Sequence, residues 1–190
     1  MFTWQSGDGR AMESARVLLS ANGLRALGRS VRAPQDGPAF TSSYRLSVDD
    51  QGVLARLSVT SATAGRERNL TLNRTDDGFW LLDNGSGGGR AEFGGALDVD
   101  LAYSPLYNSL PIRRLGLHRE PAEREIPMVF VSLPELDVEL VTQCYRTVTP
   151  LDELGRSVVH FSSENFSSGS DLVVDSEGLV LDYPGLATRL

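Results

Sequence analysis

The sequence predicts a mostly β protein, organised as a single domain that forms an antiparallel spiral β-roll or half-barrel from two related repeats, with few short helices. Three observations predict this fold: period-two alternation of apolar and polar residues, turn residues that bound each alternating segment, and a similar order of segments in the two halves. A chain of 190 residues suits one domain and buries roughly 70% of its unfolded surface without disulfides or metals.

The first half predicts a meander of short antiparallel strands. Alternating segments lie at residues 44–48, 53–60 and 69–74, and the tight-turn sequence Asp76-Asp77-Gly78 precedes a return strand over residues 79–82. Upstream of these strands, residues 18–28 predict at most a short helix. Downstream, the glycine-rich residues 84–89 predict a flexible loop.

The second half predicts strands again, after an irregular centre. A strand is expected at residues 96–101, whereas residues 104–111 hold two prolines and predict neither a strand nor a helix interior. Residues 112–117 fit a strand or a short helix. The remaining expected strands span residues 128–131, 137–148, 157–162, 171–175 and 179–183.

The two halves favour an internal duplication. Tyr44 and Tyr145, each followed by arginine, lie 101 positions apart, and Gly78 and Gly178, each preceded by an acidic residue, lie 100 apart. Between these anchors both halves have the same order of strands and turns. We therefore predict repeat one over about residues 1–95 and repeat two over about 96–190, with the two sheets sharing one core.

Composition excludes several classes of chemistry. The net charge is −7, and all 18 basic residues are arginine. Without lysine there is no Schiff-base enzyme and no phosphate-loop lysine, and the acidic balance argues against general nucleic-acid binding. One cysteine, Cys144, excludes an intrachain disulfide.

The N-terminus lacks signal-peptide features and no apolar run approaches membrane-spanning length, so we expect a cytoplasmic location and no integral membrane association.

The central segment holds the best candidates for a site. Asp98 and Asp100 lie on one face of the expected strand, and Arg113 and Arg114 follow soon after. One interpretation is a polar cluster at a pocket mouth that holds an anionic or polyhydroxylated head group. The other is a structural ion pair that fixes the proline-bounded segment against the sheet. Too few oxygen ligands are visible for a cation, so we expect no metal and no cofactor.

Aromatic residues form a second group of candidates. They could line a pocket wall that stacks on a sugar or an acyl chain, or they could pack in an ordinary core. The two histidines, His118 and His160, have no nucleophile elbow to serve, so no catalytic residue is assigned. The aromatic candidates are Trp4, Trp80, Tyr103, Tyr107, Tyr145 and Tyr183.

Several segments together resemble the putative glycolipid-binding family of bacterial proteins. They are residues 98–101, 105–115, 143–145 and 174–185, supported by Trp4 and Glu13 near the N-terminus. The stretch Asn108 to Arg114, with its Leu-Pro-Ile-Arg-Arg sequence, is the most specific of them. The resemblance covers essentially the whole chain and implies a spiral or half-barrel β fold, similar in shape to bacterial lipid and lipoprotein carriers.

The leading functional hypothesis is non-catalytic binding of an amphiphilic small molecule, a glycolipid or acyl-chain compound, in a β-roll cavity. One alternative is an enzyme that uses Asp98 or Asp100 as the acid/base group and Arg113 or Arg114 to hold an anionic substrate. Another is a protein-interaction or homodimerisation module that pairs through an exposed strand, such as residues 171–175. The predicted ligand-binding residues are Trp80, Asp98, Asp100, Tyr103, Asn108, Arg113, Arg114 and Tyr145.

Overall fold

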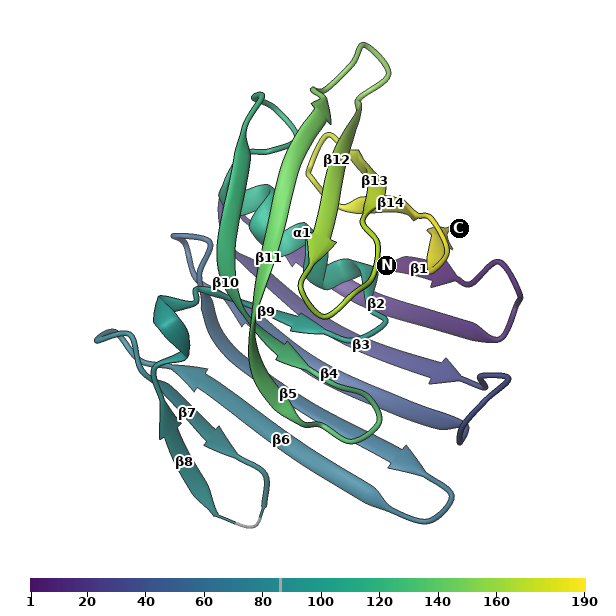
Figure 1. The fold of residues 1–190 in the computed structure, drawn as a ribbon, viewed down its shortest axis with the longest axis vertical. Coiled ribbons are helices and arrows are strands. Elements are labelled where there is room, and N and C mark those ends of the chain that lie inside the picture. The colour runs from purple at the N-terminus through teal and green to yellow at the C-terminus, as the bar shows by residue number, and fades with distance from the viewer. Residues whose placement is uncertain (86) are drawn as a thin grey trace.

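The computed structural model describes residues 1–85 and 87–190, and it confirms the mostly β roll. Within these described residues, fifteen strands form one sheet that does not close, in the order β8-β7-β6-β5-β4-β3-β2-β1-β15-β14-β13-β12-β11-β10-β9 (Figure 1). The strands are β1 (Phe2–Gln5), β2 (Ala11–Leu19), β3 (Leu24–Arg32), β4 (Phe40–Val48), β5 (Leu54–Thr63), β6 (Glu67–Arg74), β7 (Trp80–Asp83), β8 (Gly88–Ala91), β9 (Asp98–Leu101), β10 (Glu123–Val131), β11 (Val138–Thr149), β12 (Arg156–Ser163), β13 (Ser170–Asp175), β14 (Val180–Tyr183) and β15 (Ala187–Arg189).

Two meanders meet at the chain ends. Strands β1 to β8 run outward from β1, and strands β10 to β15 run back toward it, so the terminal strands β1 and β15 pair with each other. The backbone N–H of Leu190 also donates to the carbonyl of Thr3 at 2.8 Å. The sheet is therefore continuous across the two halves, while the predicted duplication of the halves stays a prediction.

Strand β9 departs from the antiparallel pattern. It pairs with β10 in parallel, with Val99 opposite Val129, because a helix and a long connection separate the two strands. Just before β9, the carbonyl of Leu97 accepts a hydrogen bond from the N–H of Leu54 at 2.9 Å. The far edge of the C-terminal half therefore curls back onto β5 of the N-terminal half.

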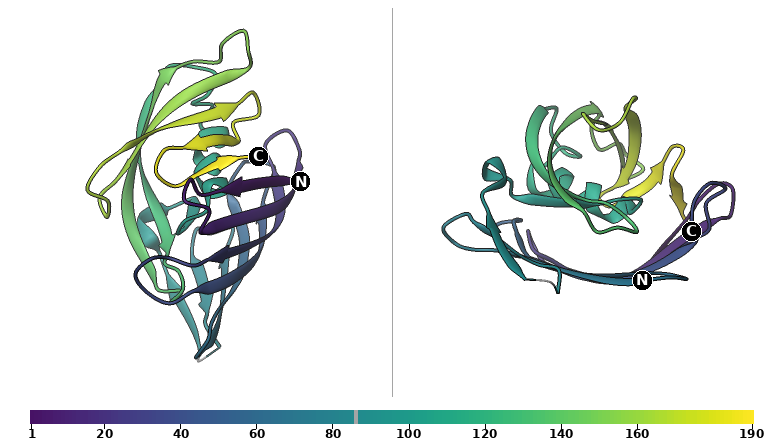
Figure 2. Two further views of the ribbon diagram at one scale, coloured as in Figure 1. Left: turned by 90° about the vertical axis from the view of Figure 1, so that its right-hand side faces the viewer. Right: turned by 60° about the horizontal axis from the view of Figure 1, so that its bottom comes forward.

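The proline-bounded centre is a helix, which corrects the sequence expectation. Helix α1 spans Pro105–Arg114, and it starts at Pro105, where a missing N–H costs no helical hydrogen bond. Pro111 lies inside the helix and removes one hydrogen bond. Burial of eight of the ten residues offsets that loss, since α1 is packed between the two halves of the sheet (Figure 2). Tertiary packing thus outweighs local propensity here.

Three further expectations are corrected. Residues 18–28 form the end of β2, a turn and the start of β3, because their apolar residues alternate across a sheet face. The glycine-rich segment begins strand β8 at Gly88, and Ser86 within it lies outside the described residues. Strand β13 is hydrogen-bonded to β12 and β14 on its two sides, so residues 171–175 are not free for edge pairing.

Helix α1 separates two apolar cores. Leu106, Tyr107 and Leu110 pack in the larger core, which fills the space under the N-terminal sheet and against β9 and β10. Ile112 packs in a smaller core enclosed by β11 to β14, together with Tyr145 and Phe161. Figure 2 shows the C-terminal strands coiled over the curved N-terminal sheet, with the helix between them. The N-terminus of α1 is consequently placed where the two halves meet.

Candidate functional site

A groove of about 450 Å³ opens beside the N-terminus of α1. One wall comes from the end of β9 and the first turns of the helix, and the other from the end of β10 and the turns that follow β12 and β14. Its large apolar residues are Leu101, Phe130, Leu133, Phe166 and Leu186, and its polar residues include Asp100, Ser104, Asn108 and Tyr183. The groove is therefore amphipathic and falls within the range of about 300–1,000 Å³ typical of small-molecule sites.

A chain of buried hydrogen bonds supports the polar side of the groove. The amide of Gln143 donates to Asp100 Oδ2 at 2.7 Å, and the hydroxyl of Tyr145 donates to Gln143 Oε1 at 3.0 Å. Asn108 Nδ2 in turn donates to the Tyr145 hydroxyl at 3.1 Å. Burial raises the pKa of Asp100 to about 6, and the bond from Gln143 opposes that rise. This network fixes the orientation of both Asp100 and Asn108 in the groove wall.

Asp98 serves a different purpose from Asp100. Its side chain is 1% exposed and receives bonds from Arg114 Nε at 3.3 and 3.1 Å, together with an ion pair to Arg114 Nη2. Burial raises the pKa of Asp98, and Arg114 opposes the rise. The pair ties the C-terminal end of α1 to β9, which agrees with the structural interpretation of these residues.

Arg113 also binds protein rather than facing the groove. Its guanidinium donates to the backbone carbonyl of Glu177 and pairs with the Glu177 carboxylate at 3.6 Å. A longer bond of 3.4 Å reaches the carbonyl of Ser20. Arg113 thereby links α1 to the β13–β14 turn and to the β2–β3 turn, and neither it nor Arg114 lines the groove.

A second polar cluster surrounds the buried carboxyl group of Glu13 on β2. The hydroxyl of Tyr44 and the hydroxyl of Ser104 both donate to Glu13 Oε1, the latter at 2.7 Å. Within the described residues, Glu13 Oε2 is buried and has no hydrogen-bond partner, and the same holds for the Tyr107 hydroxyl. Burial raises the pKa of Glu13 to about 7, against the two hydrogen bonds, which lower it. Glu13 is thus a buried carboxyl group on the inner face of the sheet whose pKa is close to neutral pH.

Gly28 makes this cluster possible. Tyr44 on β4 is the Cα partner of Gly28 on β3, and its ring lies across β3 to reach Glu13 on β2. A Cβ placed on Gly28 would lie 2.0 Å from Tyr44 Cζ, a distance that no side chain tolerates. The glycine therefore gives the tyrosine ring its path over the intervening strand.

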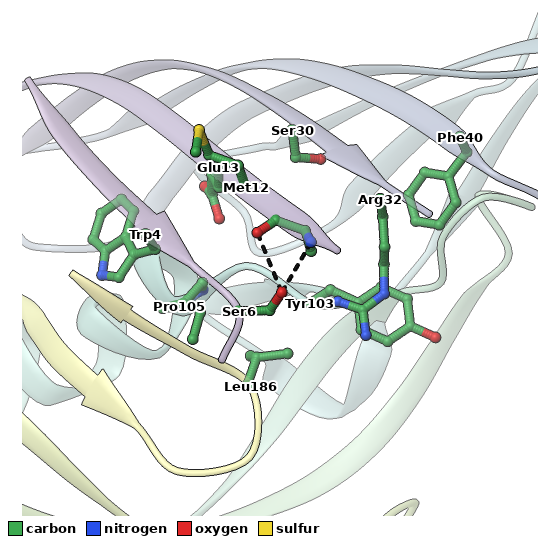
Figure 3. A pocket seen from close by; sticks show the side chains of 12 residues that line it. Trp4, Ser6, Met12, Glu13, Ser30, Arg32, Phe40, Tyr103, Pro105 and Leu186 are labelled. Atoms are coloured by element: carbon green, nitrogen blue, oxygen red, sulfur yellow. Dashed lines mark hydrogen bonds between the residues drawn. The ribbon is translucent and has the colours of Figure 1, made fainter. Parts of the chain in front are cut away.

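A small cavity of about 20 Å³ adjoins the Glu13 carboxyl, with room for about one water molecule (Figure 3). The carboxyl points from β2 toward Trp4, Pro105 and Leu186. Tyr103 and Leu186 line both this cavity and the larger groove. The hydroxyl of Ser104, which lines the groove, bonds to Glu13 behind it, so the two polar clusters flank a common wall.

Tyr103 occupies the junction between the two hollows in an unusual backbone conformation. Its φ is 67°, a left-handed value that costs energy for a residue other than glycine. The guanidinium of Arg32 stacks over the Tyr103 ring at 4.1 Å, and Phe40 lies 6.3 Å away between ring centres. Tyr103 remains 48% exposed, and its ring connects the turn before α1 with strands β3 and β4.

The structure brings three of the eight predicted site residues to the groove: Asp100, Tyr103 and Asn108. Tyr145 lies behind them and holds Asn108. The other four are placed elsewhere: Asp98, Arg113 and Arg114 make the contacts described above, and Trp80 is fully buried with its indole N–H on the carbonyl of Ala96 at 3.2 Å.

Sequence reasoning did not assign a site role to Glu13, Ser104 or Gln143. A signal for Glu13 was present, because alternation along β2 places it on the same face as the buried Ala15. An acid on an inward face needs partners, which makes it a candidate. Ser104 and Gln143 carried no comparable signal, since their partners are set by long-range packing.

Two classes of feature are not found in the part of the chain that the structure describes. There is no group of three or more histidine, cysteine or acidic side chains placed to hold a metal ion. There is also no helix with the length and apolar character needed to cross a membrane.

Fold and groove together define the class of this protein: an open β-roll with an amphipathic groove of small-molecule size beside a buried helix. The chain belongs to the putative glycolipid-binding family, whose profile matches residues 1–189. It is similar to the crystal structure of a DUF1089 family protein from Pseudomonas aeruginosa, at 29% identity and a TM-score of 0.73 over 94% of this chain and 92% of that one.

A second solved structure supports the fold alone. It is a β-barrel-like protein with a domain of unknown function, DUF1849, from Brucella abortus, at 9% identity and a TM-score of 0.52. The match covers 99% of this chain and 92% of that one. Among curated proteins, none matches this chain.

Proposed function

We propose that this protein binds an amphiphilic small molecule, a glycolipid or another acyl-chain compound, in the groove beside α1 without transforming it. The observation that carries the proposal is the composition of the groove wall. Five large apolar side chains and eight polar ones share one hollow of about 450 Å³. Membership of the putative glycolipid-binding family supports a lipid-like ligand of this kind.

The two sides of the groove suit the two ends of such a ligand. Leu101, Phe130 and Leu133 offer apolar surface against which an acyl chain loses contact with water. Asp100 and Asn108 offer a carboxyl and an amide that the buried network holds in fixed orientations. A carboxyl and an amide both form hydrogen bonds with hydroxyl-rich head groups, so we assign the polar end of the ligand to them rather than to the arginines.

A titration with a fluorescent acyl probe tests the proposal. We expect saturable binding by the unmodified protein, and Leu186→Glu should weaken it at least about tenfold, because a carboxylate would then have to be buried against the acyl chain. Leu154→Glu is the matched control, since Leu154 is 82% exposed in a loop and does not line the groove. Equal affinity for the two variants, or no saturable binding by any form, would count against the groove as the site.

One observation favours an enzyme as the second candidate function. Asp100 lines the groove, carries no ion pair among the described residues, and has a pKa raised to about 6. A carboxyl with those properties suits general acid/base chemistry near neutral pH. The arginines expected to hold an anionic substrate do not lie beside Asp100 in the groove, since Arg113 and Arg114 bind protein groups.

The Asp100→Asn variant separates the two candidates. A binding protein should keep its probe affinity within a few-fold, because asparagine accepts the same bond from Gln143. An enzyme should keep binding but lose turnover of its substrate by about 10²–10⁴-fold, as expected for loss of a general acid or base. Screening with ester and glycoside amphiphiles, with product detection by mass spectrometry, provides the readout.

A further inference from the structure

The outer face of the N-terminal sheet carries an unusual set of side chains. Alternation along β2, β3, β4 and β5 turns five arginines to solvent on the side opposite the core. We call this set the arginine face, and it comprises Arg16, Arg25, Arg29, Arg45 and Arg56.

The strand register places these arginines close together. Arg16 is the Cα partner of Leu27, which is the partner of Arg45 on the next strand. Arg25 and Arg56 are both partners of Ser47. Two shallow hollows of about 470 and 450 Å³ lie between these side chains, and Leu27 and Arg45 line both of them. The arginines thus form one patch rather than isolated charges.

No acidic side chain neutralises this patch within the described residues. None of the ion pairs of the described chain involves an arginine of the arginine face, and Arg56 bonds to the neutral Asn73 at 3.2 Å. On the four strands, Glu13 is the one acidic residue, and it is buried on the inner side. Charge is also divided along the chain: residues 1–95 hold eleven arginines and ten acidic residues, whereas residues 96–190 hold seven and fifteen.

Aliphatic side chains lie among the arginines. Leu18 is 52% exposed, Leu27 is 46% exposed and Val31 is 53% exposed, and Met12 adds a fourth apolar group near the start of β2. Within the described residues of these four strands, no exposed aromatic side chain accompanies them, because Phe40 and Tyr44 of β4 are buried on the core side. The patch therefore combines cationic groups with exposed aliphatic side chains. Exposed apolar groups that lie together among polar ones are typical of an interaction surface.

We propose that the arginine face docks this protein on the surface of an anionic lipid bilayer. Guanidinium groups bind lipid phosphates through paired hydrogen bonds, and exposed aliphatic side chains enter the boundary between head groups and acyl chains. A nucleic acid would present phosphates too, but strands that bind single-stranded nucleic acid supply aromatic groups for base stacking, which this face lacks. The net charge of −7 does not oppose docking, since the acidic excess resides in the other half of the chain.

Docking through the arginine face would not cover the groove beside α1. The arginine face lies on the convex side of the curved N-terminal sheet, whereas the C-terminal half and α1 lie on its other side (Figure 2). Docking would therefore hold the protein against a membrane while leaving the groove free on the remote side.

Vesicle co-sedimentation of the full chain tests this proposal. We compare phosphatidylcholine vesicles with vesicles of phosphatidylcholine and phosphatidylglycerol in equal parts, at low and high NaCl. We expect binding to the anionic vesicles alone and a marked loss at high salt, because salt screens exposed charges. The triple variant Arg16→Gln, Arg45→Gln, Arg56→Gln should bind about a hundredfold more weakly, at about fivefold for each arginine.

A matched triple variant on the other half provides the control. Arg124→Gln, Arg146→Gln and Arg156→Gln change the net charge equally at exposed positions of β10, β11 and β12, and they should leave vesicle binding within about twofold. Equal loss in both triple variants, no binding to anionic vesicles, or equal binding to neutral vesicles would overturn the proposal. So would displacement of the protein from vesicles by a low concentration of single-stranded RNA. Leu186→Glu should bind vesicles normally, which separates this surface from the groove.

Discussion

Replacing Glu13 by glutamine should remove a pH dependence of stability that the buried acid imposes. The folded protein holds the Glu13 proton up to about pH 7, whereas an unperturbed glutamate releases it near 4.5. Between these values the folded state binds more protons than the unfolded chain. The free energy of unfolding therefore decreases as the pH rises through this window.

The magnitude follows from the shift in pKa. A difference between 4.5 and about 7 corresponds to about 3 kcal/mol of stability, present below pH 4.5 and lost above pH 7. Glutamine is neutral throughout, and its Oε1 still accepts bonds from Tyr44 and Ser104. The stability of Glu13→Gln relative to the unmodified protein should therefore increase by about 3 kcal/mol from pH 4 to pH 8.

Urea unfolding followed by tryptophan fluorescence provides the assay, because Trp4 lines the cavity beside Glu13. Subtracting the two pH profiles cancels groups common to both proteins, including Asp100, whose pKa is also raised. Glu67→Gln is the control, since Glu67 is exposed at the start of β6, and its profile should match the unmodified protein within about 0.5 kcal/mol. A difference between Glu13→Gln and the unmodified protein that stays flat with pH, or changes with the opposite sign, would refute the reasoning.

Two further predictions concern the supports of the site. Gly28→Ala should destabilise the protein by about 1–3 kcal/mol because the new Cβ displaces the Tyr44 ring, whereas Gly65→Ala, with nothing within 4 Å, should stay within about 0.5 kcal/mol in the same unfolding assay. Arg114→Met should cost about 3–5 kcal/mol at pH 7 because it leaves the Asp98 carboxyl buried without its partner. Thermal unfolding by circular dichroism measures that cost, and a near-neutral result would mean that the ion pair does not anchor α1.

The β architecture could be predicted from the local pattern of the sequence. Segments such as residues 44–48 and 69–74 alternate and end at turn residues, and both form strands in the meander. Helix α1 could not be predicted, because Pro111 opposes a helix interior and the burial that favours the helix depends on both halves of the sheet. The parallel pairing of β9 with β10 is likewise a consequence of where that helix lies.

The site was predicted only in part, because many of its contacts also depend on long-range packing. Asp100 and Asn108 were chosen for residue type within the central segment, and that segment does line the groove. Arg113 and Arg114 were chosen by nearness in sequence to the aspartates, but each turns toward a protein partner that a one-dimensional pattern does not reveal. Glu13 accepts hydrogen bonds from residues 31 and 91 positions away in the sequence. Strand alternation indicates that this buried acid needs partners, but it does not identify them.

Native mass spectrometry of the full chain, purified without detergent, tests the central claim most directly. If the groove beside α1 retains an amphiphile, the spectrum should show a bound mass in the range of a lipid, present on the unmodified protein and on Leu154→Glu but absent from Leu186→Glu. An adduct that survives in Leu186→Glu, or unliganded protein in every sample even after incubation with acyl compounds, would contradict the account.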